Sequence, residues 1–154
     1  MNEPADRTVG RSATILVLCT GNSVRSQMAE AFLERAGGGR LDVESAGTHP
    51  WIVHPLTIQV LAERGIDWSR ARSKSMREFL DQPFDVVVTV CDDAAEQCPV
   101  YPGAARRVHR AFADPALASG THEERLGSFR RVRDEIEAWA RELAAEVLAP
   151  AAGG

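Results

Sequence analysis

One segment of this chain combines a nucleophile with a cation at a fixed spacing. It runs Cys19-Thr-Gly-Asn-Ser-Val-Arg25-Ser26 and lies between an apolar stretch, residues 14–18, and a run of good helix formers, residues 26–36. A loop between a strand and a helix can wrap its backbone N–H groups around a tetrahedral oxyanion, because the helix N-terminus adds positive potential. The same potential favours the thiolate of Cys19, which is the nucleophilic form, and the Arg25 guanidinium matches two oxygens of phosphate or arsenate.

The loop predicts a role for each of its residues. Ser26 is expected to donate a hydrogen bond to the Cys19 sulfur, and Gly21 and Asn22 tolerate the unusual backbone angles that such a loop needs. The alternative is a small buried cysteine at the end of a core strand with a solvated arginine, but the spacing and the strand–helix context favour the oxyanion loop. The predicted oxyanion-binding residues are Thr20, Gly21, Asn22, Ser23, Val24 and Arg25.

Two further cysteines follow the strongest predicted strand, residues 84–90. Cys91 comes directly after it, and Cys98 follows six polar or small residues later. A phosphatase needs one cysteine and water, whereas a reductase needs a second thiol to attack the first and a way to present the disulfide to a reductant. The spacing lacks the Cys-x2-Cys pattern of a zinc site, so no metal and no cofactor are predicted. A purely structural pair of cysteines remains the alternative.

The rest of the chain predicts the elements that position these residues. Apolar or alternating runs predict strands at 14–18, 41–45 (an edge strand), 84–90 and, more weakly, 107–112. Periodicity and capping residues predict helices at 26–36, 55–64, 75–80 and about 126–147. This alternation predicts a single α/β domain whose parallel sheet has helices on both faces. Ligands bind at the carboxyl ends of such strands, where Cys19, Cys91 and the pair Asp114-Pro115 are expected.

Composition and charge limit the classes of function. The 154 residues, 44% of them hydrophobic, suit one domain, which is placed at 13–148 between tails at 1–12 and 149–154. No apolar run approaches the roughly 20 residues of a membrane span, and the first dozen residues lack the apolar core of an export signal. The net charge of −4 argues against general nucleic-acid binding. Three cysteines without an export signal favour reduced thiols and a cytoplasmic location.

The loop strongly resembles that of the low-molecular-weight phosphotyrosine phosphatase superfamily, whose pattern is Cys-x5-Arg-Ser. The resemblance implies a four-stranded parallel sheet flanked by helices, with Cys19 as nucleophile and Arg25 as oxyanion ligand. It also implies an Asp-Pro acid from a later loop, and Asp114-Pro115 fits that position. Asp114 also suits the N-cap of a helix that has Pro115 at its first position.

Within that superfamily, the chain from Ile15 to about Val147 is similar to the thioredoxin-coupled arsenate reductases. The resemblance implies arsenate as substrate and thioredoxin as reductant. It implies a relay in which Cys19 attacks arsenate, Cys91 attacks Cys19, and Cys98 attacks Cys91. A phosphatase acting on phosphate monoesters through Cys19 is an alternative, as is an oxyanion-binding or redox-sensing protein without turnover. A low-molecular-weight thiol such as mycothiol is an alternative electron donor. The shared features are, in order, the loop, Ser45-Ala46-Gly47, the Cys91–Cys98 segment and Asp114-Pro115-Ala116.

A few positions depart from these relatives or are less certain in role. Many relatives have another cysteine where Val24 stands. Some bind potassium at positions that correspond to Asn22, Glu30 and Ser45, completed by an acidic residue where this chain has Lys74. The Lys74 ammonium is expected to take the place of the cation, which predicts no potassium requirement, although a solvated lysine is the common case. The two isolated tryptophans at positions 51 and 68 are expected to cover the edge of the core more than to border the site.

Overall fold

The structure is a computed structural model that describes residues 12–92, 101–102 and 104–150. It contains one parallel sheet with the strand order β2-β1-β3-β4. The strands are β1 (Ala13–Cys19), β2 (Leu41–Gly47), β3 (Phe84–Thr89) and β4 (Ala104–His109). The helices are α2 (Arg25–Gly37), α3 (Pro55–Ala62) and α4 (His122–Leu148), with short 3-10 helices η1 (Met76–Phe79) and η2 (Pro115–Leu117). The predicted four-stranded parallel sheet, with β2 at an edge, is confirmed.

The central strand β1 has no solvent face. Successive side chains of a strand point to opposite faces of the sheet. Ile15 and Val17 belong to the core that the α-helices cover, whereas Leu16 and Leu18 pack on the other side with Phe79 of η1. These four residues in the middle of β1 are fully buried. This is why the segment is uniformly apolar instead of alternating.

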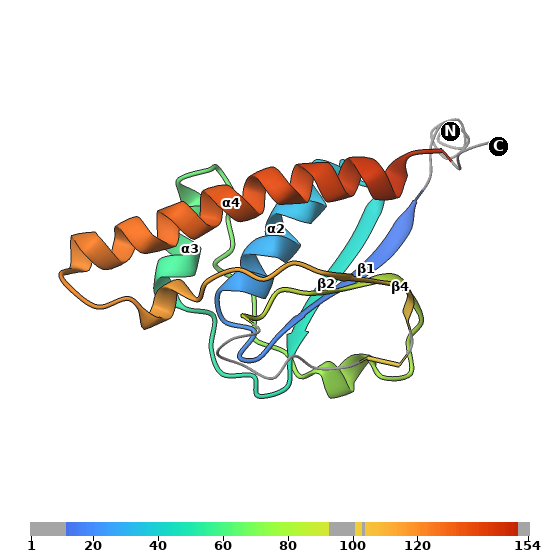
Figure 1. The fold of residues 1–154 in the computed structure, drawn as a ribbon, viewed down its shortest axis with the longest axis horizontal. Coiled ribbons are helices and arrows are strands. Elements are labelled where there is room, and N and C mark those ends of the chain that lie inside the picture. Colours follow the sequence, from blue (N-terminus) through green and yellow to red (C-terminus); the bar gives the residue numbers. More distant parts are fainter. Residues whose placement is uncertain (1–11, 93–100, 103, 151–154) are drawn as a thin grey trace.

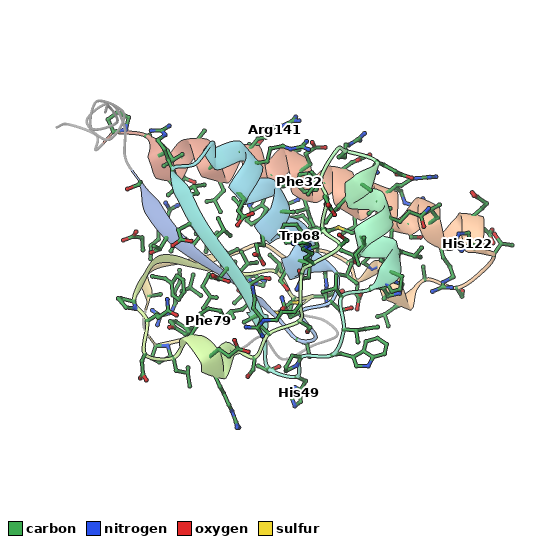
Figure 2. All side chains as sticks on the ribbon, turned by 180° about the vertical axis from the view of Figure 1, so that it is seen from behind. Phe32, His49, Trp68, Phe79, His122 and Arg141 are labelled. Carbon is green, nitrogen blue, oxygen red and sulfur yellow. The ribbon has the colours of Figure 1, made fainter. Side chains whose placement is uncertain are left out.

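The α-helical side of the sheet holds most of the core. α2 lies between the sheet and the long helix α4, and α3 lies beside them (Figure 1). Phe32 of α2 lies on this side and Phe79 on the other (Figure 2). The apolar stripe predicted for the last helix is confirmed, since its residues are buried or packed against this core. None of the helices in the described part of the chain is long and apolar enough to cross a membrane.

Local signals place most helix ends. α2 ends at Gly37, and its C-cap Gly38 has a φ of 57°, in the left-handed region that favours glycine. Ser75 caps η1 by accepting a hydrogen bond from the Arg77 N–H at 3.1 Å. The carboxylate of Glu78 also binds the guanidinium of Arg72 at 2.7 Å.

The strand β4 lies three residues earlier than the predicted strand at 107–112. It pairs Val86 with Arg106 and Val88 with Val108 at the edge of the sheet. Exposed charged side chains such as that of Arg106 are common on edge strands. Because of them, β4 lacks the apolar pattern by which a strand is predicted from sequence. The predicted strand extended to Phe112 because this residue is apolar. In the structure Phe112 lies beyond β4 and is buried against Trp139 of α4, with ring centroids 5.5 Å apart.

Candidate active site

The carboxyl edge of the sheet brings two of the three cysteines to neighbouring strands. Cys19 ends β1, and Cys91 lies two residues beyond the end of the adjacent strand β3. The Val90 N–H donates to the Leu18 carbonyl at 3.0 Å, which continues the pairing up to the cysteines. Both cysteines are buried; Cys19 is a free thiol and Cys91 is disulfide-bonded. Cys98 lies outside the described residues.

The carbonyl groups of the loop are all held by its surroundings. In a trans peptide the N–H points away from the C=O, and the described residues contain no cis peptide. The N–H groups of residues 21–25 therefore face away from the donors that bind the loop carbonyls, as in an anion-binding nest. The carbonyls of residues 20–24 accept, in order, from His49 N, Trp51 N with Ser73 Oγ, Gln27 Nε2, His54 N with Thr57 Oγ1, and Met28 N.

Asn22 is the conformational centre of the loop. Its φ is 48°, in the left-handed region, where asparagine is tolerated better than most residues. Its Oδ1 accepts from Lys74 N at 2.8 Å and from Gln27 Nε2 at 3.0 Å. Its Nδ2 donates to Ser26 Oγ at 2.8 Å and to Ser45 Oγ at 2.9 Å. Four hydrogen bonds therefore fix the side-chain amide of this residue.

The glycine that the loop requires is Gly47 on the neighbouring strand β2, and not Gly21 within the loop. A Cβ on Gly47, at the end of β2, would overlap the Thr20 carbonyl oxygen and lie 3.0 Å from Asn22 N. In the loop, which the structure describes throughout, Asn22 alone has a positive φ. A Cβ on Gly21 would meet only Ser23 Cβ, at an ordinary 3.8 Å. The expectation that Gly21 adopts an unusual backbone conformation is therefore wrong, because Asn22 alone makes the turn.

Ser26 lies where the sequence predicted it. Its Oγ is 2.9 Å from Cys19 Sγ, and the side chain is fully buried. Val24 is the N-cap residue of α2 and makes no side-chain capping bond, and the first turn of this fully described helix contains no acidic residue. The positive end of α2 thus faces the loop without an acidic side chain in its own first turn.

Arg25 and Asp114 meet beside the loop. Arg25 is buried at the first residue of α2, and its Nη2 lies 3.5 Å from Asp114 Oδ2. Its Nη1 donates to the Phe112 carbonyl at 3.3 Å. Asp114 also caps η2, because its Oδ1 accepts from Ala116 N at 3.0 Å. The capping interpretation of Asp114 is confirmed, and the same carboxylate lies beside Arg25 of the loop.

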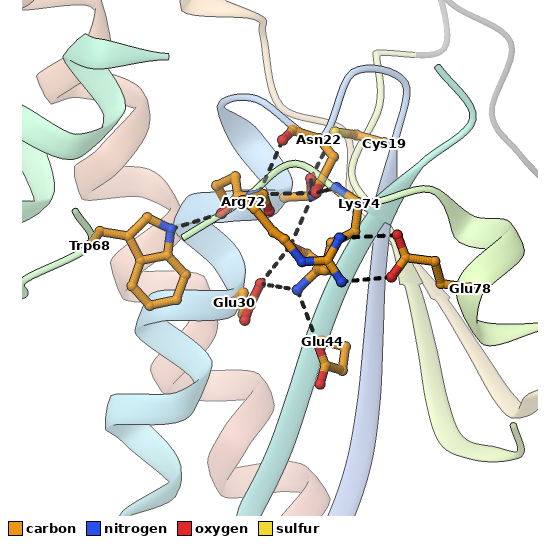
Figure 3. A network of polar contacts seen from close by, with 11 residues as sticks. Cys19, Asn22, Glu30, Glu44, Trp68, Arg72, Lys74 and Glu78 are labelled. Atoms are coloured by element: carbon orange, nitrogen blue, oxygen red, sulfur yellow. Dashed lines mark hydrogen bonds and ion pairs between the residues drawn. The ribbon is translucent and has the colours of Figure 1, made fainter. Parts of the chain in front are cut away.

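A buried carboxylate lies behind the loop (Figure 3). Ser45 Oγ donates to Glu30 Oε1 at 2.5 Å, and Lys74 Nζ lies 3.5 Å from Glu30 and 2.9 Å from Glu44. Burial raises the pKa of Glu30 to about 7, although Lys74 and Ser45 act to lower it. The Lys74 side chain is only 11% exposed, so it is not the solvated lysine of the alternative interpretation. Its contact with Asn22 is made by the backbone N–H and not by the ammonium.

Comparison with known proteins identifies the family. Residues 14–151 match the family described as Low molecular weight phosphotyrosine protein phosphatase. The chain belongs to this family. An arsenate reductase of Halalkalibacterium halodurans is 48% identical over 122 residues, which are 79% of this chain and 88% of that relative.

Solved structures agree with this assignment to the phosphotyrosine phosphatase family. One described as an arsenate reductase in the phosphate binding state is 31% identical, with a TM-score of 0.75, covering 88% of this chain and 98% of that chain. A thioredoxin-dependent arsenate reductase of Corynebacterium glutamicum is 28% identical, with a TM-score of 0.66, covering 89% and 62%. The resemblance seen in the loop is thus confirmed, and these relatives are arsenate reductases.

Sequence reasoning missed two residues that this family member uses to build its site. Gln27 and Trp68 were not connected with the loop, yet the Trp68 indole N–H donates to Gln27 Oε1 at 2.8 Å, and Gln27 bonds to Asn22. Trp68 is half-buried and also packs on the core, as expected. Trp51 is not at the core edge. Its side chain is 71% exposed, and its backbone N–H donates to the Gly21 carbonyl. The contacts of Trp68 with Gln27 and of Trp51 with Gly21 join segments far apart in the sequence, so only the tertiary structure reveals them.

Within residues 12–92, 101–102 and 104–150, no group of three or more His, Cys, Asp or Glu side chains is arranged to hold a metal ion. The arrangement around Cys19 offers instead a nucleophile, backbone N–H groups and a guanidinium. These groups suit covalent chemistry on an oxyanion.

Proposed function

We propose that this chain reduces arsenate to arsenite, with thioredoxin as the electron donor. The observation that carries the proposal is an oxyanion loop with a second cysteine on the neighbouring strand: Cys19 ends β1 and Cys91 follows β3. Hydrolysis of a phosphate ester would use only the first of these thiols. The arsenate reductases among the relatives support the substrate, and the thioredoxin-dependent relative of Corynebacterium glutamicum supports the donor.

The first step is attack of the Cys19 thiolate on arsenic. A sulfur–arsenic bond forms while one arsenate oxygen leaves as water. Asp114 supplies a proton to that oxygen, since its carboxyl group lies 3.5 Å from the Arg25 guanidinium that binds the anion. Arg25 and the N–H groups of residues 21–25 stabilise the negative charge on the remaining oxygens.

The second step transfers two electrons to arsenic. In the reduced protein, where thioredoxin has opened the disulfide of Cys91, the Cys91 thiolate attacks the Cys19 sulfur, a sulfur–sulfur bond forms, and the sulfur–arsenic bond breaks. Its electron pair stays on arsenic, which leaves as arsenite. Cys98 then attacks Cys91, which releases Cys19 as a thiolate and leaves a Cys91–Cys98 disulfide for thioredoxin to reduce. The role of Cys98 is supported by this chemistry and by its six-residue separation from Cys91 in the sequence.

The test is arsenate-dependent NADPH consumption in the presence of thioredoxin and thioredoxin reductase. Turnover is expected for the wild-type protein and is expected to vanish in Cys19→Ser, Cys91→Ser and Cys98→Ser. Cys91→Ser should still form the thio-arsenate adduct, detectable as loss of one titratable thiol. Hydrolysis of an aryl phosphate is followed in parallel. Fast hydrolysis that is indifferent to Cys91 and Cys98, without NADPH consumption, would assign the chain to the phosphatases. Turnover with mycothiol but not with thioredoxin would change the donor.

We also propose that the reaction needs no potassium ion. The Lys74 ammonium already lies between the carboxylates of Glu30 and Glu44, so a fixed cation neutralises the charge behind the loop. The rate and the melting temperature are expected to be equal in potassium and sodium chloride of the same ionic strength. A potassium-specific rise in either quantity would refute the proposal.

A further inference from the structure

Gln27 connects the loop to two other segments of the chain. Its side chain is 1% exposed in the first turn of α2. Its Nε2 lies within 3.1 Å of three oxygens, namely the carbonyl and Oδ1 of Asn22 and the carbonyl of Arg72. Its Oε1 accepts from the Trp68 indole N–H at 2.8 Å. Every polar atom of this buried amide is therefore in use.

Trp68 determines which way the Gln27 amide faces. An indole N–H can only donate, so the atom opposite it must be an acceptor. The oxygen of Gln27 therefore faces Trp68, and its nitrogen faces Asn22. Figure 3 shows Trp68 beside the polar network, with a dashed line that runs from its ring nitrogen into the network. Without such a fixed donor, the two ends of a glutamine amide can exchange positions.

The Gln27 amide and the backbone N–H of Lys74 together fix the orientation of Asn22. Asn22 Oδ1 receives two hydrogen bonds from donors that cannot accept, Gln27 Nε2 at 3.0 Å and Lys74 N at 2.8 Å. Its Nδ2 must therefore donate to the hydroxyl oxygens of Ser26 and Ser45. A flipped Asn22 amide would oppose its nitrogen to two donors, Gln27 Nε2 and Lys74 N, and its oxygen would draw the hydroxyl hydrogens of Ser26 and Ser45.

The direction of these bonds reaches the nucleophile. Because Asn22 donates to Ser26 Oγ, the single hydroxyl hydrogen of Ser26 remains for Cys19 Sγ at 2.9 Å. A hydrogen bond donated to sulfur stabilises the thiolate over the thiol. We infer that Gln27 is a positioning residue for the Cys19 thiolate, acting through Asn22 and Ser26, and that Trp68 anchors it. The inference rests on the proposed function only in taking Cys19 as the nucleophile.

A purely structural role for Gln27 makes a different prediction. Loss of a buried, fully bonded amide lowers stability in either case. Only the positioning role shifts the pH at which Cys19 ionises and the pH profile of its reactions. The deciding quantity is therefore the midpoint of thiolate formation, followed by ultraviolet absorbance and by the rate of alkylation with iodoacetamide. Replacement of Cys91 and Cys98 by serine leaves Cys19 as the single titrating thiol.

The test compares three variants in that background. Gln27→Met removes the amide at similar length and is expected to raise the midpoint by about one pH unit, a tenfold change in the thiolate equilibrium. Trp68→Phe removes only the anchor and is expected to produce a smaller rise. Trp139→Phe, a buried tryptophan of α4 that packs on Phe112, is the matched control and should leave the midpoint unchanged.

The same variants with all cysteines present give a second readout. The kcat/KM for arsenate is expected to fall about tenfold in Gln27→Met below the midpoint and to recover at higher pH, where the thiolate forms in both proteins. An unchanged midpoint in Gln27→Met would overturn the inference. If Gln27→Met fails to fold, an unchanged midpoint in the milder variant Trp68→Phe overturns it. If arsenate is not reduced at all, the proposed function fails, while the alkylation rate still tests Gln27.

Discussion

Two glutamates of this chain lie beside basic side chains and shift in opposite directions. Burial raises the pKa of Glu30 to about 7, despite the nearby Lys74. Hydrogen bonds lower the pKa of Glu63 to about 2, and the bond from Arg130 has a larger effect than that from Arg133. Proximity to a positive charge therefore does not by itself determine the charge state of a carboxyl group in this fold.

Water and geometry explain the difference. The Glu30 side chain is 11% exposed and shares one ammonium, 3.5 Å away, with Glu44. The Glu63 side chain is 30% exposed and receives guanidinium bonds of 2.6 Å from both Arg130 and Arg133. Desolvation outweighs a single distant ion pair, whereas two short charged bonds outweigh partial burial. The ion pair of Glu30 with Lys74 thus helps to position the loop at some cost in stability. The ion pairs of Glu63 with Arg130 and Arg133, between α3 and α4, stabilise the fold.

The largest effect is expected from removing the buried carboxylate. Glu30→Ala leaves the Ser45 hydroxyl without its acceptor and should lower the free energy of unfolding by about 2–3 kcal/mol. Activity should fall about tenfold, because Ser45 also bonds to Asn22 of the loop. Urea denaturation and arsenate-dependent NADPH consumption measure the two effects. Glu30→Gln keeps an acceptor for Ser45, so it is the matched control and should cost less than about 1 kcal/mol. Equal losses in both variants would contradict this account.

The pH dependence of stability should separate the two glutamates. Between pH 4.5 and about 7, Glu30 keeps its proton in the folded protein and loses it in the unfolded chain. Its contribution to stability therefore falls as pH rises through this window, by at most about 3.5 kcal/mol. The contribution of Glu63 is present above pH 4.5 and is lost as pH falls toward 2. Urea denaturation at a series of pH values should show these separate windows as the difference in stability between the wild-type protein and each of Glu30→Gln and Glu63→Gln. Overlapping windows would refute the comparison.

A smaller effect is expected at the surface. Glu63→Ala removes the acceptor of Arg130 and Arg133 between α3 and α4 and should cost about 1 kcal/mol. Arg133 keeps the Val60 carbonyl and Asp134 as partners, which limits the loss. Activity should not change, because these residues do not contact the loop. A destabilisation as large as that of Glu30→Ala, measured in the same urea titrations, would show that exposure does not separate the two sites.

The smallest expected effect is that of salt. The coupling between Glu63 and Arg130, measured by a double-mutant cycle, should fall by less than about 0.5 kcal/mol at high salt, where the Debye length is about 3 Å. The coupling between Glu30 and Lys74 should stay constant, because both side chains are nearly buried. Similar salt sensitivity at both pairs would indicate that water reaches Glu30.

The accuracy of the sequence prediction followed the range of the interactions. The sequence predicted the strand before Cys19, the contact of Ser26 with its sulfur and the cap formed by Asp114, and the structure confirms all three. Each involves partners at most seven residues apart, or a single apolar run. The strand β4 was misplaced because its position depends on pairing with β3, which the charged residues of an edge strand do not reveal.

What the sequence alone determined is the loop and its flanking strand and helix, since backbone preference and apolar pattern are local properties. Only the tertiary structure decided how that loop is held. Trp68 reaches Gln27 across 41 residues, and Lys74 reaches Asn22 across 52. Such contacts form only when the parallel sheet brings the carboxyl ends of its strands together. They have no periodicity or spacing along the chain, because each depends on where a distant segment returns to the loop.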